Sequence, residues 1–205
     1  GFVSCGTATG TTKVAIVKPD ESEVLPPGSV GEICVHGSSV TLGYLNTDDP
    51  TRTLTHGAEV WINGFPYFRT GDLGFIDNGE MFVTGRQKDM IILAGRNVFP
   101  DDIEKIVEES HESIRSGRAI AFAINVDTEE KLVVVAELSN KFGQISQEEL
   151  ENTARIAIAQ QAQVALHDIC LVRSGELPRT LSGKKQRQQC AAMYHEIRKR
   201  SQQIE

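Results

Sequence analysis

Four short segments of the sequence combine residue types that can bind or activate a substrate. The first, FRTGD at residues 68–72, ends in Asp72 directly after a Thr-Gly pair. A carboxylate that leaves a strand at a Gly-Asp turn can keep both oxygens free to accept hydrogen bonds, which suits the two adjacent hydroxyl groups of a ribose. The alternative interpretation is that Asp72 only caps a β-turn, where aspartate is common.

The second segment, GRQKD at residues 85–89, has a glycine and alternating charges but no apolar side chain. This composition favours a solvated hinge, and a plain linker is the alternative. Arg86 in this segment can hydrogen-bond the sugar or a phosphate of a nucleotide, or it can pair with a local carboxylate.

The third segment, GRNVFPDDIE at residues 95–104, favours a structural role. Gly95 and Asn97 can adopt positive φ, and Pro100 suits the first position of a helix. The two aspartates that follow would then lie near the positive end of the helix dipole. We therefore expect this segment to join a strand to a helix through a turn.

The fourth segment, LPRTLSGK at residues 177–184, places Lys184 on a loop ahead of a helix. A lysine on such a loop can approach an anionic transition state and neutralise the charge that develops there. A solvated surface lysine is the alternative. The segment is not a Walker A loop, because Gly175 and Gly183 lie eight residues apart instead of five and Lys185 follows where Ser or Thr is needed.

Other kinds of chemistry have little support in the sequence. The five histidines are scattered, and none has metal-ligand spacing to another. No G-x-S-x-G segment or Cys/His nucleophile pattern is present. We therefore predict no metal ligands within this chain.

The composition is that of an ordinary globular protein with a formal net charge of −7. Nucleic-acid binding would require a more basic chain. The longest apolar stretches, Met90–Ala94 and Ala119–Ile124, are far shorter than the roughly 20 residues of a membrane span. The four cysteines form no C-x-x-C pair, and we interpret them as reduced thiols of a cytoplasmic protein. The start at Gly1, without a methionine, indicates a piece of a longer protein.

The elements that must hold these segments differ between the two halves of the chain. The first half predicts short strands separated by turns, which favours a small barrel or curled sheet. Asn78-Gly79 between two apolar runs predicts a hairpin, and Thr47–Arg52 predicts one short helix. The expected strands are Lys13–Lys18, Gly31–His36, Tyr67–Thr70, Leu73–Ile76 and Glu80–Thr84.

The second half alternates between strand and helix patterns. Helices are expected from Pro100, with an apolar stripe at Ile103, Ile106 and Val107, and from the capping box that begins at Ser146. A last helix is expected around Cys190, Met193, Tyr194 and Ile197, which follow helical spacing. The expected strands are Ile91–Ala94, Ala119–Val126, Leu132–Leu138 and Ile169–Val172. The fold class is therefore α+β, with a small barrel-like first part and a compact second domain of about 120 residues.

Taken together and in this order, the four segments resemble those of the adenylate-forming superfamily of acyl-CoA synthetases, luciferases and adenylation domains. The resemblance implies that Asp72 binds the ribose of the nucleotide and that Arg86 contacts the nucleotide. It implies that Lys88 is the hinge residue and that Lys184 is the catalytic lysine. The match covers essentially the whole chain, and it implies that residues 1–87 end a large N-terminal domain while residues 88–205 form its C-terminal lid.

Within the superfamily the chain is most similar to the fatty acyl-AMP ligases. The similarity lies in the phrases RTGDLGFI, GRQKDMII, GRNVFPDDIE and LPRTLSGKKQR. The absence of proline from Gln163–Asp168 argues against a peptide-synthetase adenylation domain. Leu181 departs from the pattern, because Ser or Thr is more usual there.

The resemblance implies an enzyme that uses ATP and Mg²⁺ to form a fatty acyl-AMP and then passes the acyl group to an acyl carrier protein. The phosphate-binding loop and the magnesium ligand would lie upstream of Gly1, so the fragment alone is expected to be inactive. An acyl-CoA synthetase and a non-catalytic interaction module with the same fold are the alternatives.

Overall fold

A computed structural model describes residues 2–41, 58–140, 143 and 145–202, together with the backbone of Tyr44–Leu45 and Leu54–Thr55. The helix predicted at Thr47–Arg52 lies outside these residues. The chain divides into two compact units, Gly1–Lys88 and Asp89–Glu205, and each is described by itself.

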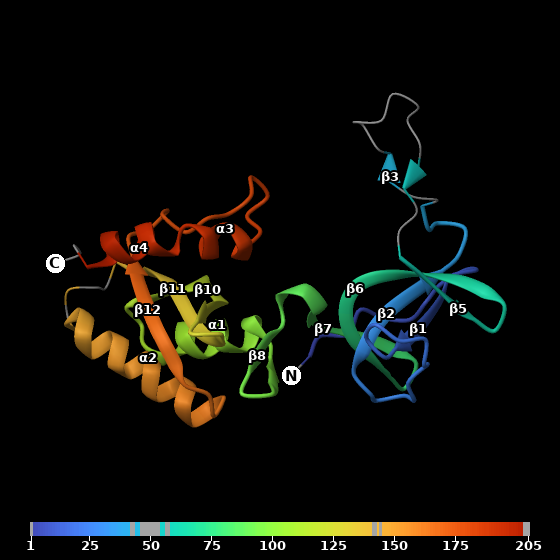
Figure 1. Cartoon of the computed structure of the whole chain (residues 1–205), viewed down its shortest axis with the longest axis horizontal. Helices are drawn as coiled ribbons and strands as arrows, with labels where there is room; N and C mark the ends of the chain where they lie inside the picture. Colours follow the sequence, from blue (N-terminus) through green and yellow to red (C-terminus); the bar gives the residue numbers. More distant parts are fainter. Residues whose placement is uncertain are drawn as a thin grey trace. The chain divides into compact units, whose positions relative to one another are not determined.

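The first unit is built around an antiparallel sheet in which β6, a long curved strand, is the centre (Figure 1). The strand order is β1-β2-β6-β5, and β7 also pairs with β6. Val17, Cys34, Val60 and Tyr67 form a small buried core on this sheet. The strands are β1 (Lys13–Val17), β2 (Gly31–His36), β5 (Glu59–Ile62), β6 (Phe65–Asp77) and β7 (Glu80–Arg86), and β3 (Tyr44–Leu45) pairs separately with β4 (Leu54–Thr55).

The hairpin predicted at Asn78-Gly79 is confirmed. Asp77 pairs with Glu80, and the two residues between them have φ values of 48° and 82°. Positive φ at both central positions is the requirement of a type I′ turn, which matches the right-handed twist of the flanking strands. The turn therefore sets the register that brings β7 back along β6.

The prediction of two strands at Tyr67–Thr70 and Leu73–Ile76 was wrong, because β6 runs through both. Cys34 of β2 pairs with Arg69, while Glu32 pairs with Leu73, so three residues of β6 lie opposite one residue of β2. This is a β-bulge, and Gly71 allows it by adopting a φ of 72°.

The second unit has a three-stranded sheet with helices on both faces, which confirms the α+β class (Figure 1). Strand β10 is antiparallel to β11, and β11 is parallel to β12. Figure 1 shows α1 and α2 on one face and α3 and α4 on the other. The elements are α1 (Pro100–Ser110), β10 (Ile114–Val126), β11 (Glu129–Leu138), α2 (Gln147–Gln161), β12 (Leu166–Val172), α3 (Arg187–Ala192) and α4 (Tyr194–Ser201).

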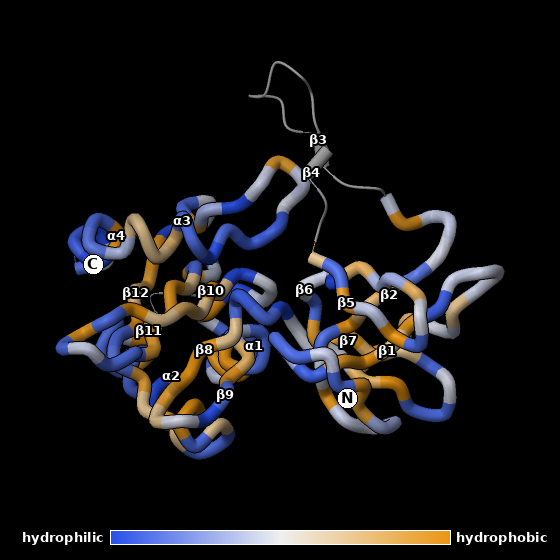
Figure 2. The backbone as a smooth tube through the Cα atoms, turned by 45° about the vertical axis from the view of Figure 1, so that its right-hand side comes forward, coloured by the Kyte–Doolittle hydropathy of each residue, from blue (hydrophilic) through white to orange (hydrophobic). Residues whose placement is uncertain are grey.

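Two hydrophobic cores result from the alternation of side chains along these strands. Val134 and Ala136 of β11 face the core under α1 and α2, whereas Val133 and Val135 face the core under α3 and α4. Figure 2 shows the apolar stretches along β11 and β12 that supply both layers. The sheet therefore lies between two helical layers.

The predicted starts of two helices are confirmed. Pro100 occupies the first turn of α1, and both aspartates that follow lie in that turn. Ser146 caps α2, because its Oγ accepts a hydrogen bond from the backbone N–H of Glu149 at 3.2 Å.

The connection between the first strand of the second unit and α1 differs from the prediction. It contains a second strand, so β8 (Ile91–Leu93) and β9 (Arg96–Val98) form a hairpin. Ala94 and Gly95 adopt positive φ at its turn, and Asn97 instead pairs with Ile92. Of the two residues that can adopt positive φ, Gly95 does so and Asn97 does not, because the two-residue turn ends at Gly95 and Asn97 lies in β9.

The last predicted helix is interrupted. Cys190 lies in α3, whereas Tyr194 and Ile197 lie in α4, and Met193 is the cap between them. Cys190, Tyr194 and Ile197 are nevertheless all buried in one core, as their spacing predicts. In the part of the chain that the structure describes, no helix is long and apolar enough to cross a membrane.

Candidate functional site

The predicted nucleotide residues Asp72 and Arg86 are brought together by the pairing of β6 with β7. They are direct cross-strand partners, and Nε of Arg86 donates to Oδ1 of Asp72 at 2.8 Å. The side chains remain 34% and 54% exposed, respectively. A local carboxylate was one of the possible partners of Arg86 in the sequence analysis, and the structure shows that Arg86 pairs with Asp72. Their contact engages Oδ1, so Oδ2 can accept a further hydrogen bond.

The backbone under Asp72 is fixed by a buried acid from β2. Glu32 is only 4% exposed, forms an ion pair with Arg69, and accepts a hydrogen bond from the N–H of Gly71 at 3.1 Å. Thr70 Oγ1 accepts from the N–H of Asp72 at 3.0 Å. The bulge is therefore held by one side chain from β2 and one from β6 itself, which fixes the backbone from which Asp72 projects.

Sequence reasoning missed Glu32 as a supporting residue. The signal was present, because Glu32 lies in the expected strand Gly31–His36, directly before three apolar residues. A carboxylate there needs compensating donors. The FRTGD segment supplies them, with Arg69 and the N–H of Gly71.

Lys88 is exposed and ends the first unit, inside a single turn of 3₁₀ helix, η1 (Gln87–Asp89). The residue before it is anchored in the first unit, where Nε2 of Gln87 donates to Asp20 at 3.0 Å. The residue after it is anchored in the second unit, where Asp89 accepts from Arg187 at 3.3 Å. Lys88 is therefore the residue between a side chain that is bound to the first unit and one that is bound to the second.

Lys184 lies in a tight loop whose backbone is well braced. The N–H of Thr180 donates to the carbonyl of Lys184 at 2.9 Å, and the N–H of Lys184 donates to Oγ1 of Thr180 at 3.0 Å. Gly183 adopts a φ of 83° to close the turn. The side chain of Lys184 is exposed. The loop thus holds the backbone while presenting the ammonium group to solvent.

Arg179 fastens this loop to the body of the second unit. Its guanidinium donates to the carbonyl of Gly183 at 2.8 Å and to the carbonyl of Gly117. Leu181, the position at which the sequence departs from the family pattern, projects fully into solvent. The hydroxyl groups of Thr180 and Ser182 lie 2.9 Å apart and supply the polar contact at the tip.

A buried charge cluster adjoins this loop, and sequence reasoning missed it. Glu104 is 1% exposed and lies between Lys185 and Arg187, which both bind its carboxylate. Burial raises the pKa of Glu104, against the opposing effect of the two cations. Burial alone would lower the pKa of Arg187, but the carboxylates around it outweigh this and hold the pKa above its usual value.

The signal for this cluster was the position of Glu104 beside Ile103 on the buried face of α1. The acids of α1 were predicted to serve the helix dipole, which describes Asp101 and Asp102 in the first turn. Glu104 belongs instead to the packed interior, where it also accepts a hydrogen bond from the N–H of Ala121 at 2.9 Å.

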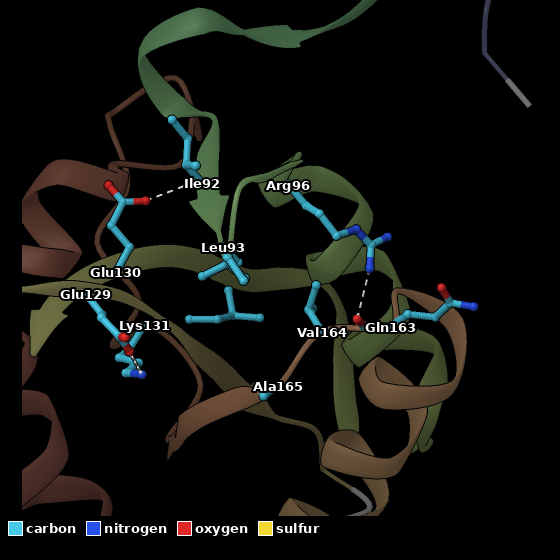
Figure 3. Close-up of a pocket in the computed structure, with 11 residues that line it drawn as sticks. Ile92, Leu93, Arg96, Glu129, Glu130, Lys131, Gln163, Val164 and Ala165 are labelled. Atoms are coloured by element: carbon cyan, nitrogen blue, oxygen red, sulfur yellow. Dashed lines mark hydrogen bonds and ion pairs between the residues drawn. The ribbon is translucent and has the colours of Figure 1, made fainter.

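The second unit also has a cavity of about 400 Å³ between the β8–β9 hairpin, the start of β11 and the chain after α2 (Figure 3). Arg96 donates to the carbonyl of Gln163 at 3.1 Å across one side, and Glu130 accepts from the N–H of Ile92 at 2.8 Å. None of the predicted site residues lines this cavity. Of the predicted residues, Arg86, Lys88 and Lys184 are instead exposed, and Asp72 is partly exposed.

The residues that the structure describes do not form a fitting site for magnesium. Among them, no group of three or more His, Cys, Asp or Glu side chains could hold a metal ion.

Two family models match the chain. Residues 88–203 match the AMP domain of Disco-interacting protein 2-like proteins, and residues 2–45 match the AMP-binding enzyme family. The first match includes Lys88 and Lys184, and the second includes Glu32, whereas Asp72 and Arg86 lie between the two matched ranges.

Curated relatives and solved structures agree with these models. The chain is 40% identical to the medium-chain-fatty-acid–[acyl-carrier-protein] ligase JamA of Moorena producens, over 95% of this chain and 33% of JamA. It is 40% identical to the putative fatty-acid–CoA ligase FadD21 of Mycobacterium tuberculosis, over 94% of this chain and 34% of FadD21.

A structure from work on fatty acyl-adenylate ligases of E. coli and L. pneumophila superposes with a TM-score of 0.74 at 30% identity, covering 95% of this chain and 32% of that one. The chain therefore spans about a third of the length of the curated relatives it matches. By sequence and by fold, it belongs to the adenylate-forming, AMP-binding superfamily, near the fatty acyl-AMP ligases and the AMP domains of Disco-interacting protein 2-like proteins.

Proposed function

We propose that this chain is the C-terminal part of an ATP-dependent fatty acyl-AMP ligase, which we call the parent enzyme. Residues 1–87 would end its N-terminal adenylation domain, and residues 88–205 would form its lid. The observation that carries the proposal is the cross-strand pair of Asp72 and Arg86. This pair presents an oriented carboxylate beside a cation, an arrangement that suits the binding of the ribose of a nucleotide.

In the first half-reaction, a carboxylate oxygen of the fatty acid attacks the α-phosphorus of ATP, and pyrophosphate leaves. Asp72 would accept hydrogen bonds from the ribose hydroxyls, so that the α-phosphate is held in place for the attack. Arg86 would orient Asp72 and contact the nucleotide. Magnesium, when bound, neutralises charge on the phosphates.

Lys184 would act at the transition state of this step. Negative charge grows on the α-phosphate as the fifth oxygen approaches, and an ammonium group placed there offsets it. Such a contact is worth about 3–4 kcal/mol, or roughly 100- to 1000-fold in rate. The exposed side chain on a braced loop supports this role, since it can meet a substrate without reorganising its own backbone.

In the second half-reaction, a thiolate attacks the acyl carbonyl carbon, and AMP leaves. We propose that rotation at Lys88 withdraws Lys184 and gives the thiol access. The anchors at Gln87 and Asp89 support this role, because they confine the backbone change to the residue between them.

The proposed acceptor is the phosphopantetheine thiol of an acyl carrier protein. JamA supports this choice, since its name specifies a carrier-protein product. The name of FadD21 specifies coenzyme A, so a CoA ligase is the second candidate.

The test supplies the parent enzyme with ATP, magnesium and fatty acid, together with either coenzyme A or a phosphopantetheinylated carrier protein. We expect fatty acid-dependent ATP–pyrophosphate exchange and an acyl thioester on the carrier protein, identified by mass spectrometry. Acyl-CoA as the main product would favour the second candidate. A parent that forms no acyl-AMP would contradict both.

A further inference from the structure

A network of charged side chains joins the segment that follows Lys88 to the loop that carries Lys184. It lies within the second unit and is centred on Glu104 of α1. Its other members come from the end of η1, from both ends of α1 and from the residues that follow the loop. They are Asp89, Asp101, Glu108, Lys185 and Arg187.

Arg187 is the branching point of the network. Its Nη1 lies 3.3 Å from Oδ2 of Asp89, and its Nη2 lies 2.5 Å from Oδ1 of Asp101. Its Nε and Nη2 each lie 3.1 Å from an oxygen of Glu104. One side chain thus binds the residue directly after the proposed hinge and the buried centre of the cluster.

Lys185 connects the cluster to the loop. Its Nζ forms an ion pair with Glu104, and its backbone forms an antiparallel bridge with Arg179. The side chain of Lys185 turns inward to Glu104, whereas that of its neighbour Lys184 is exposed to solvent.

Stability alone is a weak reason for such a cluster. Desolvation cancels much of the attraction in a buried ion pair, and apolar side chains of similar size often stabilise a fold as well. What a many-partner arrangement does provide is a single geometry, since Glu104 meets Lys185, Arg187 and the N–H of Ala121 at once.

We propose that Glu104, Lys185 and Arg187 are positioning residues for Lys184, which fix the catalytic loop to the segment beyond Lys88. The inference rests on the proposed function. A rotation at Lys88 would then bring the ammonium group of Lys184 to the α-phosphate in one defined position. This follows because the segment after Lys88 and the loop that carries Lys184 would move as one rigid body. A displacement of about 1 Å at a reacting group can cost roughly 100-fold in rate.

The test compares Lys185→Met and Arg187→Met in the parent enzyme. We expect kcat for acyl-AMP formation to fall about 10- to 100-fold, with KM for ATP within about threefold. Transfer of the acyl group from supplied acyl-AMP to the thiol should stay within about threefold, because Lys184 is withdrawn during that step. Lys185→Arg keeps the ion pair and should recover most of the lost rate.

Arg198→Met is the matched control. Arg198 also anchors a helix of the second unit through an ion pair, with Asp168 of β12, but it has no contact with the network. We expect this variant to lose thermal stability while forming acyl-AMP within about twofold of the unchanged enzyme.

The inference is overturned if Lys185→Met forms acyl-AMP at the unchanged rate, or if both half-reactions fall together in proportion to the folded fraction. It is also overturned if Arg198→Met gives the same selective loss. These outcomes differ from failure of the proposed function, in which the unchanged parent forms no acyl-AMP at all.

Discussion

Asp72 illustrates how one side chain can carry a testable role in substrate binding. Asp72→Ala in the parent enzyme should raise KM for ATP by about 10- to 100-fold, because a hydrogen bond to a charged group is worth about 1.5–3 kcal/mol. Asp77→Ala is the control, since Asp77 ends the same strand, is exposed and should leave KM unchanged. ATP–pyrophosphate exchange measures both. An unchanged KM in Asp72→Ala would remove Asp72 from the nucleotide site.

The cysteines give a prediction that is independent of the proposed reaction. Burial raises the pKa of Cys34 to about 11 and those of Cys170 and Cys190 to about 12, whereas Cys5 is exposed. Thiols react as thiolates. Iodoacetamide at pH 8 should therefore modify Cys5 in the native protein and the other three only after unfolding in urea, as peptide mapping would show. Rapid native modification of Cys170 would contradict the structure.

The same pKa shifts predict how stability changes with pH. The folded state holds the three buried thiol protons more tightly than the unfolded state, whose thiols have a pKa near 9.0. The contribution of these thiols to the free energy of unfolding is therefore fully present below pH 9. It falls as the pH rises towards 11 or 12, by roughly 1.4 kcal/mol for each thiol and each pH unit. Urea midpoints at pH 8 and pH 10 would check the direction, and a midpoint that rises would contradict it.

At the scale of elements, Gly74 shows how closely β6 packs against its neighbours. A Cβ at this position would lie 2.3 Å from the carbonyl oxygen of Phe82 and 2.8 Å from Cδ1 of Ile33. Gly74→Ala should therefore destabilise the first unit by about 1–3 kcal/mol. Val83→Ala is the control, because Val83 pairs with Gly74 but is exposed and should cost less than about 0.5 kcal/mol. Equal urea midpoints for the two variants would contradict this packing.

Elements set by local chemistry could be predicted from the sequence, and those set by distant partners could not. The hairpin at Asn78-Gly79 and the start of α1 at Pro100 follow from the backbone preferences of those residues. The bulge in β6 depends on Glu32, which lies 39 residues before Gly71. No window of sequence around the bulge contains that acid, so the strand was predicted as two pieces.

The candidate site shows the same division. The types of Asp72, Arg86 and Lys184 suggested their chemistry, and pairing in the sheet brings the first two together. The cluster around Glu104 was missed because its partners come from segments about 80 residues apart, as the pair of Glu104 and Arg187 shows. Only the packing of α1 against the following sheet brings those charges together.

At the scale of the whole molecule, the proposed hinge makes the two half-reactions separable. Lys88→Pro in the parent enzyme fixes φ near −65° and removes a backbone N–H, so that the lid would favour one orientation. We expect acyl-AMP formation and thiol transfer from supplied acyl-AMP to diverge by at least about tenfold. Lys88→Ala leaves the backbone free and should keep their ratio. Equal losses in both steps for Lys88→Pro would argue against a pivot at this residue.

The central claim is that Lys184 stabilises the transition state of adenylation. The most direct test is Lys184→Ala in the parent enzyme, with Lys199→Ala as the control because Lys199 is an exposed lysine of α4 in the same unit. The account predicts that kcat for acyl-AMP formation falls by about 100- to 1000-fold in Lys184→Ala, with KM for ATP within about threefold, while the control keeps its rate. A folded Lys184→Ala variant that forms acyl-AMP at the unchanged rate would contradict it.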